Sequence, residues 1–306
     1  MSNRLNVTVL TMAASVALVC ALAATSGAQA PPAGAEPTPR LADGTPNLGR
    51  VPGEKGVWNL PYITNFGDRV LGPDGVMPVP ARGRGAGAGR GGGPLGGGEG
   101  TTGGGRGGAK SEPQVPFMPW SAAVYDYNSR NQSKYDPEGY CLPPGGPRLM
   151  ATPYPMEIIQ LPEQKRIIMI FEGGTHIWRE IYMDGRPHPQ GDALNPTYLG
   201  HSVGRWEGDT LVVDVVGFNE ETWLDYYGHP HTDMLHVVEK FSRPDKNTLH
   251  YEATIDDPGA YTKPWTVAWN IPWRANAELT EYICQENNRY LERLTDDFDR
   301  PIFKKP

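Results

Sequence analysis

Eight short segments between residues 156 and 273 restrict the fold of this chain more than any other feature. Each is rich in β-branched and aromatic residues, the composition typical of β-strands. They are residues 156–161, 165–171, 175–183, 199–206, 210–218, 234–241, 247–255 and 265–273. Turn-forming residues separate several of them, including Gly173-Gly174 and Asp184-Gly185. Short turns without helical crossovers favour an antiparallel up-and-down meander, and eight strands suit a closed or nearly closed all-β barrel.

Alternation within these segments predicts which side chains face the interior. One face is mainly aliphatic, and the other mixes ionisable and aromatic residues. Arg179 and Glu239 both stand on the aliphatic face, where a buried charge needs a partner or a role. They either pair with each other or form a polar site in an apolar cup. The mixed face is either the wetted exterior of the sheet or a source of groups for a ligand at the barrel mouth.

The N-terminal residues have the layout of a secretory signal peptide. Arg4 precedes an apolar run over residues 7–24, and small residues follow as far as Ala28. We expect a signal peptide over residues 1–28, because Pro31 disfavours a later cut. No other apolar run approaches the roughly 20 residues that span a bilayer. The mature protein is therefore expected to be periplasmic or secreted, with no membrane contact after signal cleavage.

Two of the three cysteines, Cys141 and Cys284, remain after cleavage, since Cys20 lies in the signal peptide. An even pair in an oxidising compartment usually forms a disulfide. We expect a structural disulfide here, with two separate thiols as the alternative.

The composition divides the remaining chain into three parts. Residues 82–112 are dominated by glycine and cannot bury enough apolar surface to offset the entropy of ordering, which predicts a disordered linker. Residues 29–81 are expected to form an extended N-terminal arm anchored by Trp58, and residues 113–306 the β-barrel domain. Only residues 281–294 look able to form a helix, so we expect one short C-terminal helix.

The charge distribution argues against a nucleic-acid partner. The formal net charge is -7 and the isoelectric point about 5.5, with both signs mixed along the chain. Nucleic-acid binding requires a basic stripe or patch, which is missing from this sequence.

The stretch GHPHTDMLH, residues 228–236, contains three of the seven histidines. In an extended chain His229, His231 and Asp233 lie on one side, and His236 on the other. Three interpretations remain open: a loop whose histidines make local hydrogen bonds, an acid/base site built on His231, or a metal site made by two histidines and a carboxylate.

Further candidates lie near the ends of the predicted strands. His201 is either a catalytic group at the barrel mouth or a surface histidine. The aromatic residues before the histidines either form the apolar wall of a ligand site or belong to the core, and no Ser or Cys stands out as a nucleophile. The residues expected to bind a ligand are Arg148, Glu172, Trp206, Trp223, Tyr227, His229 and Glu239.

Several motifs together resemble a large group of exported bacterial proteins of largely unassigned activity. They include CLPPGGPR, REIYMDGRPHP, GHSVGRWEGDTLVVDVVGFN, HPHTDMLHVVEKFSR and EYICQENN. The resemblance covers nearly the whole mature chain except the glycine-rich insert, which departs from the pattern of the group. In addition, Gly56-Val57-Trp58 resembles the lipocalin signature on the first strand of a ligand-binding barrel.

These features lead to one functional expectation and two alternatives. We expect an exported enzyme that needs no cofactor and performs acid/base chemistry, as an isomerase, lyase or hydrolase, on a mostly apolar, ring-bearing compound. His231 would be the base, Asp233 its orienter, and Arg179 or Arg148 would stabilise developing negative charge, with His201 as a second candidate base. The alternatives are a periplasmic ligand-binding protein without catalysis and a histidine-ligated metalloprotein.

Overall fold

The computed structural model describes residues 34–72, 74–76, 115–131, 134–286, 288 and 300. The predicted signal peptide and glycine-rich linker lie outside these residues. So does most of the predicted C-terminal helix, of which residues 281–286 form an irregular segment and a turn, not a helix.

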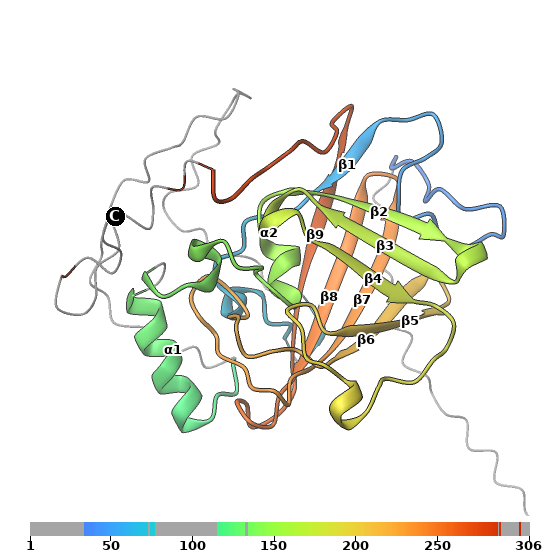
Figure 1. The fold of residues 1–306 in the computed structure, drawn as a ribbon. Coiled ribbons are helices and arrows are strands. Elements are labelled where there is room, and N and C mark those ends of the chain that lie inside the picture. The colour runs from blue at the N-terminus through green and yellow to red at the C-terminus, as the bar shows by residue number, and fades with distance from the viewer. Residues whose placement is uncertain are drawn as a thin grey trace, which may run out of the picture.

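Nine strands form one closed barrel, which confirms the predicted all-β barrel (Figure 1). The strands are β1 (Gly56–Asn59), β2 (Pro155–Leu161), β3 (Arg166–Phe171), β4 (Trp178–Tyr182), β5 (His201–Glu207), β6 (Thr210–Val216), β7 (His236–Asp245), β8 (Thr248–Asp256) and β9 (Trp265–Ala275). The last eight lie within or overlap the eight segments expected from the sequence. The ninth strand, β1, comes from the N-terminal arm and pairs with both β2 and β9, so this part of the arm belongs to the barrel wall itself.

Strand order follows the chain, and every neighbouring pair is antiparallel except one. β4 and β5 are parallel, with Ile181 opposite Ser202 and Tyr182 opposite Val203. The prediction of a fully antiparallel meander is wrong at this point. A parallel neighbour requires a connection that returns to the starting end of the barrel, and residues 183–200 are long enough to make that return.

The helices of the described residues lie outside the barrel wall. They are α1 (Pro119–Asn131), α2 (Gly173–His176) and the 3-10 helices η1 (Phe66–Arg69), η3 (Pro137–Tyr140), η4 (Pro147–Ala151), η5 (Pro162–Gln164) and η6 (Gly191–Ala193). α1 was not predicted from the sequence. It begins with Pro119, at a position where proline is favoured, and carries an Asp126–Arg130 ion pair one turn apart. None of the helices in the described ranges is long and apolar enough to cross a membrane.

Side chains fill the interior of the barrel. Burial alternates along β7 and β8, as the period of two predicts, and the inward side chains are the predicted aliphatic face. Large inward residues from five strands are almost fully buried: Met156, Met169, Phe241, Tyr251 and Trp269. All five belong to one hydrophobic core cluster in the barrel interior.

One end of the barrel is closed around Trp58. Its indole Nε1 donates to the Leu48 carbonyl at 2.7 Å, and its ring packs edge-on against Trp273. Arg243 lies over both rings, with its guanidinium carbon 4.9 Å and 5.6 Å from their centroids. The same guanidinium donates to the carbonyls of Asn47, Gly49 and Lys246. Arg243 thus ties the arm to the barrel.

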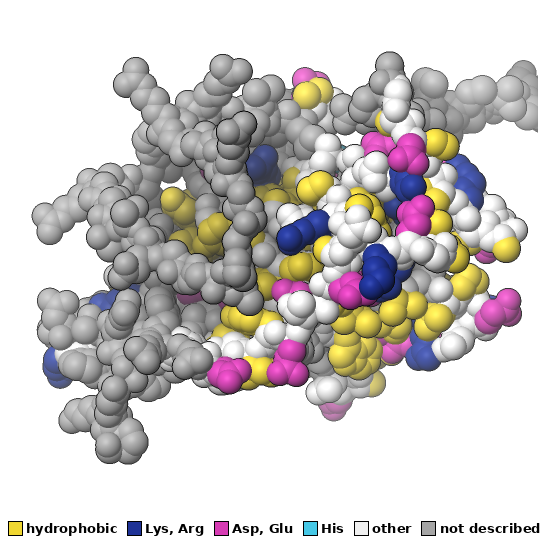
Figure 2. Space-filling model, turned by 90° about the horizontal axis from the view of Figure 1, so that it is seen from above, with side chains coloured by type: hydrophobic (Ala, Val, Ile, Leu, Met, Phe, Trp, Pro, Cys, Tyr) yellow, Lys and Arg dark blue, Asp and Glu magenta, His cyan; other side chains and the backbone are white. Residues whose placement is uncertain are grey.

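The surface next to β1 and β2 mixes charges of both signs. Figure 2 shows basic and acidic side chains interspersed among apolar ones on this face. The expectation that nucleic acid is not a partner stays a prediction.

At the other end, loops and α1 cover the barrel. Ser121 and Asn128 of α1 donate to the carbonyls of Ala260 and Gly228, which lie in two of these loops. A disulfide joins Cys141 and Cys284, as predicted, across 143 residues of chain, and it attaches the C-terminal segment to this end.

Candidate functional site

A cavity of about 540 Å³ opens among the loops where β1 ends and β2 begins. We call it the mouth cavity. Its lining residues come from six separate stretches of the chain: Tyr62, Asp136, Glu138, Gly139, Leu142, Thr152, Pro153, Tyr154, Gly174, Tyr226, Tyr282, Cys284, Glu286 and Asn288. Its volume lies within the range of roughly 300–1,000 Å³ typical of small-molecule sites.

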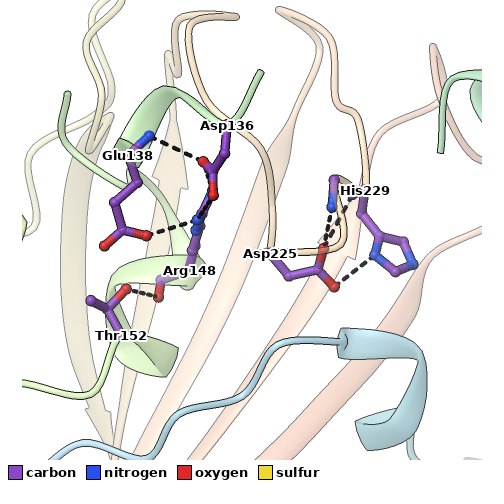
Figure 3. Close-up of polar contacts among 7 residues, drawn as sticks. Asp136, Glu138, Arg148, Thr152, Asp225 and His229 are labelled. Carbon is purple, nitrogen blue, oxygen red and sulfur yellow. Dashed lines mark hydrogen bonds and ion pairs between the residues drawn. The ribbon is translucent and has the colours of Figure 1, made fainter. Parts of the chain in front are cut away.

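An ion-pair cluster underlies the mouth cavity (Figure 3). Arg148, from η4, donates to both carboxylate oxygens of Asp136 at 2.8 and 2.6 Å and to Glu138 Oε2 at 2.7 Å. Asp136 caps η3 by accepting from the Glu138 amide at 3.0 Å, which brings the two carboxylates to one side of Arg148. The cluster holds two successive turns of the chain together at the cavity floor.

The charges in this cluster respond differently to burial. Burial favours the neutral form of Arg148, but the bonds and charges of Asp136 and Glu138 outweigh it, so the pKa of Arg148 is raised and it stays positive. Burial is also the largest influence on Glu138, and there it prevails, raising the pKa of that carboxyl above its ordinary value despite Arg148. Arg148 was expected to bind a ligand. In the structure it lies behind the lining and bonds to two carboxylates, Asp136 and Glu138, that line the cavity.

Two pairs of tyrosines line the cavity above this floor. Tyr62 and Tyr226 meet edge to face at 6.2 Å, and Tyr154 and Tyr282 are tilted at 4.8 Å between ring centroids. Burial raises the pKa of Tyr62 to about 12 and raises that of Tyr154 further, so both remain neutral phenols at physiological pH. They provide apolar faces together with hydroxyl groups.

The buried dyad of Asp225 and His229 lies beside the cluster and is structural (Figure 3). Neither side chain is exposed, and His229 Nδ1 lies 2.7 Å from Asp225 Oδ2. Asp225 also accepts from the amides of Phe66 and Gly228 at 2.6 and 2.9 Å. Burial opposes ionisation of Asp225, but the His229 ring and the amides of Phe66 and His229 outweigh it and lower its pKa. The dyad fastens the loop containing residues 225–229 to the N-terminal arm.

The ring of His229 is buried among aromatic side chains. Its ring stacks on Phe117 at 5.3 Å and contacts Tyr125 at 4.3 Å between centroids. His229 was expected to bind a ligand, whereas the structure places it in a packed aromatic cluster away from the lining of the mouth cavity.

His231 is buried and is engaged at both ring nitrogens. Nδ1 lies 3.2 Å from the Thr232 carbonyl, which can only accept, so Nδ1 carries the proton. Nε2 lies 2.9 Å from the Thr222 hydroxyl, which then donates to it. Burial lowers the pKa of His231, in agreement with this neutral form. Asp233 is exposed and is not among the hydrogen-bond partners of His231, so the structure does not bring the expected base and orienter together.

The histidines of residues 228–236 do not converge on one point. His229 binds Asp225, His231 binds Thr222, and His236 Nε2 binds Asp214 at 3.1 Å on the outer face of the barrel. Within the described ranges, no group of three or more His, Cys, Asp or Glu residues has an arrangement suited to a metal ion. Of the three interpretations of GHPHTDMLH, local hydrogen bonding is the one that the geometry matches.

Arg179 and Glu239 pair inside the barrel, the first of the two alternatives for these charges. Arg179 Nε donates to Ser202 Oγ at 3.0 Å, and the Tyr251 hydroxyl donates to Glu239 Oε1 at 2.7 Å. Neither charged residue is among those lining the mouth cavity.

His201 points outward from β5, not into the mouth. Its Nδ1 lies 2.8 Å from that of His188, whose Nε2 contacts Asp214 Oδ1 at 3.0 Å. Burial, followed by the neighbouring His188, lowers the pKa of His201. This outer cluster is separate from the cavity lining.

The other predicted ligand-binding residues lie at or beyond the edge of the cavity. Glu172 Oε2 accepts from the Thr280 amide at 2.7 Å and thereby holds the segment that carries Tyr282. Trp206 packs against the core near the β5–β6 hairpin. Trp223 and Tyr227 are half-buried and do not line the cavity, although the neighbouring Tyr226 does.

The main lining residues were missed because they lie in irregular segments. Tyr62, Asp136, Glu138, Tyr154 and Tyr282 have no common periodicity or short motif. Two of the resemblance motifs carried a signal: CLPPGGPR contains Leu142 and Arg148, and EYICQENN contains Tyr282, Cys284, Glu286 and Asn288.

The mouth cavity is thus defined by geometry rather than by a known signature. The chain matches no protein-family model, no curated protein and no solved structure with which it was compared.

Proposed function

We propose that the protein binds a small organic molecule in the mouth cavity. The observation that carries this proposal is the cavity itself, about 540 Å³ in volume and lined by four tyrosines and a few polar groups. Concave sites with aromatic walls and a small number of placed polar groups are typical of ligand binding. The disulfide and the Arg148 cluster hold the lining segments in place, so the site needs little ordering when a ligand arrives.

Binding without catalysis is better supported than acid/base chemistry at His231. The base and its expected orienter are not in contact, and the lone pair on Nε2 is occupied by Thr222. His231 is also absent from the cavity lining. The enzymatic function, whether isomerase, lyase or hydrolase, remains a prediction, because the described structure does not pair His231 with Asp233.

A compound panel tests the proposed function directly. The mature, disulfide-intact protein is screened by ligand-observed NMR and by thermal shift against soluble cations, anions and neutral ring compounds. We expect saturable binding by part of the panel, with a ligand at 100 times its dissociation constant raising the free energy of unfolding by about 2.7 kcal/mol.

A space-filling variant locates the binding. Leu142→Trp adds bulk to an exposed lining residue, and Met234→Trp adds the same bulk to an exposed residue outside the cavity. We expect the first variant to weaken binding at least about tenfold, equivalent to 1.4 kcal/mol, and the second to leave it unchanged. The proposal would be contradicted if Leu142→Trp left the affinity unchanged, or if no compound in the panel bound saturably.

The proposed setting is the periplasm or the extracellular space. The signal-peptide pattern of residues 1–28 supports it, and the disulfide is compatible with an oxidising compartment. Mass spectrometry of the protein from fractionated cells should find a mature chain beginning at Gln29 in the exported fraction. An uncleaved chain in the cytoplasm would refute this setting.

A further inference from the structure

The charge of the mouth cavity is negative, and this bears on what it binds. Asp136, Glu138 and Glu286 contribute carboxylates to the lining, and none of the described lining residues is basic. Arg148 behind the floor supplies one compensating positive charge. An anionic ligand would therefore meet uncompensated negative charge in a partly desolvated site.

Most of the hydrogen bonds from Arg148 to this cluster go to Asp136. Arg148 binds both oxygens of that carboxylate in a fork-like pair, and these two side chains are 4% and 3% exposed. Glu138 receives only a single further bond from the same guanidinium, and its side chain is 27% exposed. Its negative charge is the surplus one in the cluster, and a second cation would be its natural partner.

The two tyrosine pairs and Glu138 line the same cavity. Burial is the main cause of the raised pKa of Tyr62 and of Tyr154, and the charge of Glu138 adds to the rise in both. Glu138 therefore lies within electrostatic reach of one tyrosine of each pair. Tyrosine ring faces attract organic cations, with about 0.5–1 kcal/mol at exposed sites and about 2 kcal/mol where water is excluded.

Resting on the proposed function, we propose that the ligand of the mouth cavity is an organic cation, an amine or quaternary ammonium compound. The tyrosine faces contact its apolar substituents, and Glu138 and Glu286 face its charge. The carboxylates discriminate against anions, and since the described part of the lining contains no basic residue, none of its side chains opposes the charge of the ligand.

A pair of isosteric probes tests this inference by calorimetric titration of the mature protein. Choline carries a quaternary nitrogen, and 3,3-dimethyl-1-butanol has a carbon atom in its place. We expect choline to bind at least about tenfold more tightly, which corresponds to 1.4 kcal/mol. We also expect its affinity to fall with added salt, because half-exposed charges are screened.

Four variants connect that preference to named side chains. Glu138→Gln and Glu286→Gln should each weaken choline binding while leaving the neutral alcohol unaffected. Tyr62→Leu, which removes a ring face, should weaken choline binding, whereas Tyr62→Phe should retain it. Glu138 also bonds to Arg148, so circular dichroism first establishes that each variant is folded. If Glu138→Gln does not fold, Glu286→Gln and the two Tyr62 variants test the inference.

The outcomes separate the two proposals. If the alcohol binds as well as choline, or if only anions and neutral rings from the compound panel bind, the cation inference is overturned and ligand binding stands. If choline binding is unchanged in all the folded variants, the inference is overturned because the cation sits elsewhere. If no compound of any charge binds, the proposed function fails as well.

Discussion

Arg179 on β4 and Glu239 on β7 form an ion pair inside the barrel, with 6% and 2% of their side chains exposed. The Ser202 and Tyr251 hydroxyls complete the network. A charge left alone at this depth would lose most of its hydration without compensation, so the two residues depend on each other.

Removing one member of this pair is expected to be costly. Arg179→Met should lower the free energy of unfolding by about 3–5 kcal/mol, because it leaves the Glu239 carboxylate buried without its cation. Urea denaturation measures the loss. The double variant Arg179→Met/Glu239→Gln, which removes both charges, should recover at least half of it, and a double variant as unstable as the single one would refute the coupling.

The disulfide is expected to stabilise the folded protein and to hold part of the mouth-cavity lining in place. Cys141→Ser/Cys284→Ser opens a link between residues 143 positions apart and should lower the free energy of unfolding by about 2–4 kcal/mol, since closing a long loop restricts the unfolded chain. Because Cys284 lines the cavity, the same variant should weaken ligand binding even where it remains folded. Equal affinity in the folded double variant would show that the cavity does not need this attachment.

The buried His231 is expected to make stability depend on pH. Its pKa lies below the ordinary value of 6.5, so the unfolded chain takes up the proton more readily than the native protein. Stability should therefore rise with pH between the lowered native pKa and 6.5, by at most about 1.4 kcal/mol per pH unit, and then level off. His231→Gln should remove this contribution in urea unfolding experiments between pH 5 and pH 8.

The pKa of His250 is shifted in the opposite direction from that of His231, so His250 serves as a control for the pH dependence of stability. Burial lowers its pKa, but bonds to Glu252 and Asn270 outweigh that effect and raise it above 6.5. Its stabilising contribution is complete below 6.5 and is lost as the pH rises through the native value. His250→Gln should therefore change the pH profile in the opposite direction from His231→Gln, and identical changes would refute the assignment of either shift.

Arg243 is expected to stabilise the folded protein through its stacking and hydrogen bonds as well as through its charge. It lies over Trp58 and Trp273 and donates to three backbone carbonyls, while burial lowers its pKa to about 10. Lysine cannot reproduce the planar stacking or the fork of donors. Arg243→Lys should cost about 2–3 kcal/mol of unfolding free energy, whereas Arg205→Lys on the surface should cost less than about 0.5 kcal/mol.

Local chemistry was sufficient to predict the strands. β-branched runs between turns marked the positions of β2 to β9, and the alternation along β7 and β8 identified their inward faces. The cysteine count and the export signal predicted the disulfide. α1 was missed because its amphipathic pattern is weak: it bonds to the loops at Gly228 and Ala260, and Tyr125 and Asn128 are among its few buried residues.

The sequence by itself therefore determined the barrel and its interior, because a period of two depends only on neighbours along the chain. The parallel pairing of β4 and β5, the choice of partner for Arg179 and the mouth cavity were decided only by the tertiary structure. Tyr62, Glu138 and Tyr282 meet because barrel closure and the disulfide bring distant irregular segments together. Such convergence leaves no periodic trace in the sequence, since loop positions follow from where the strands end in space.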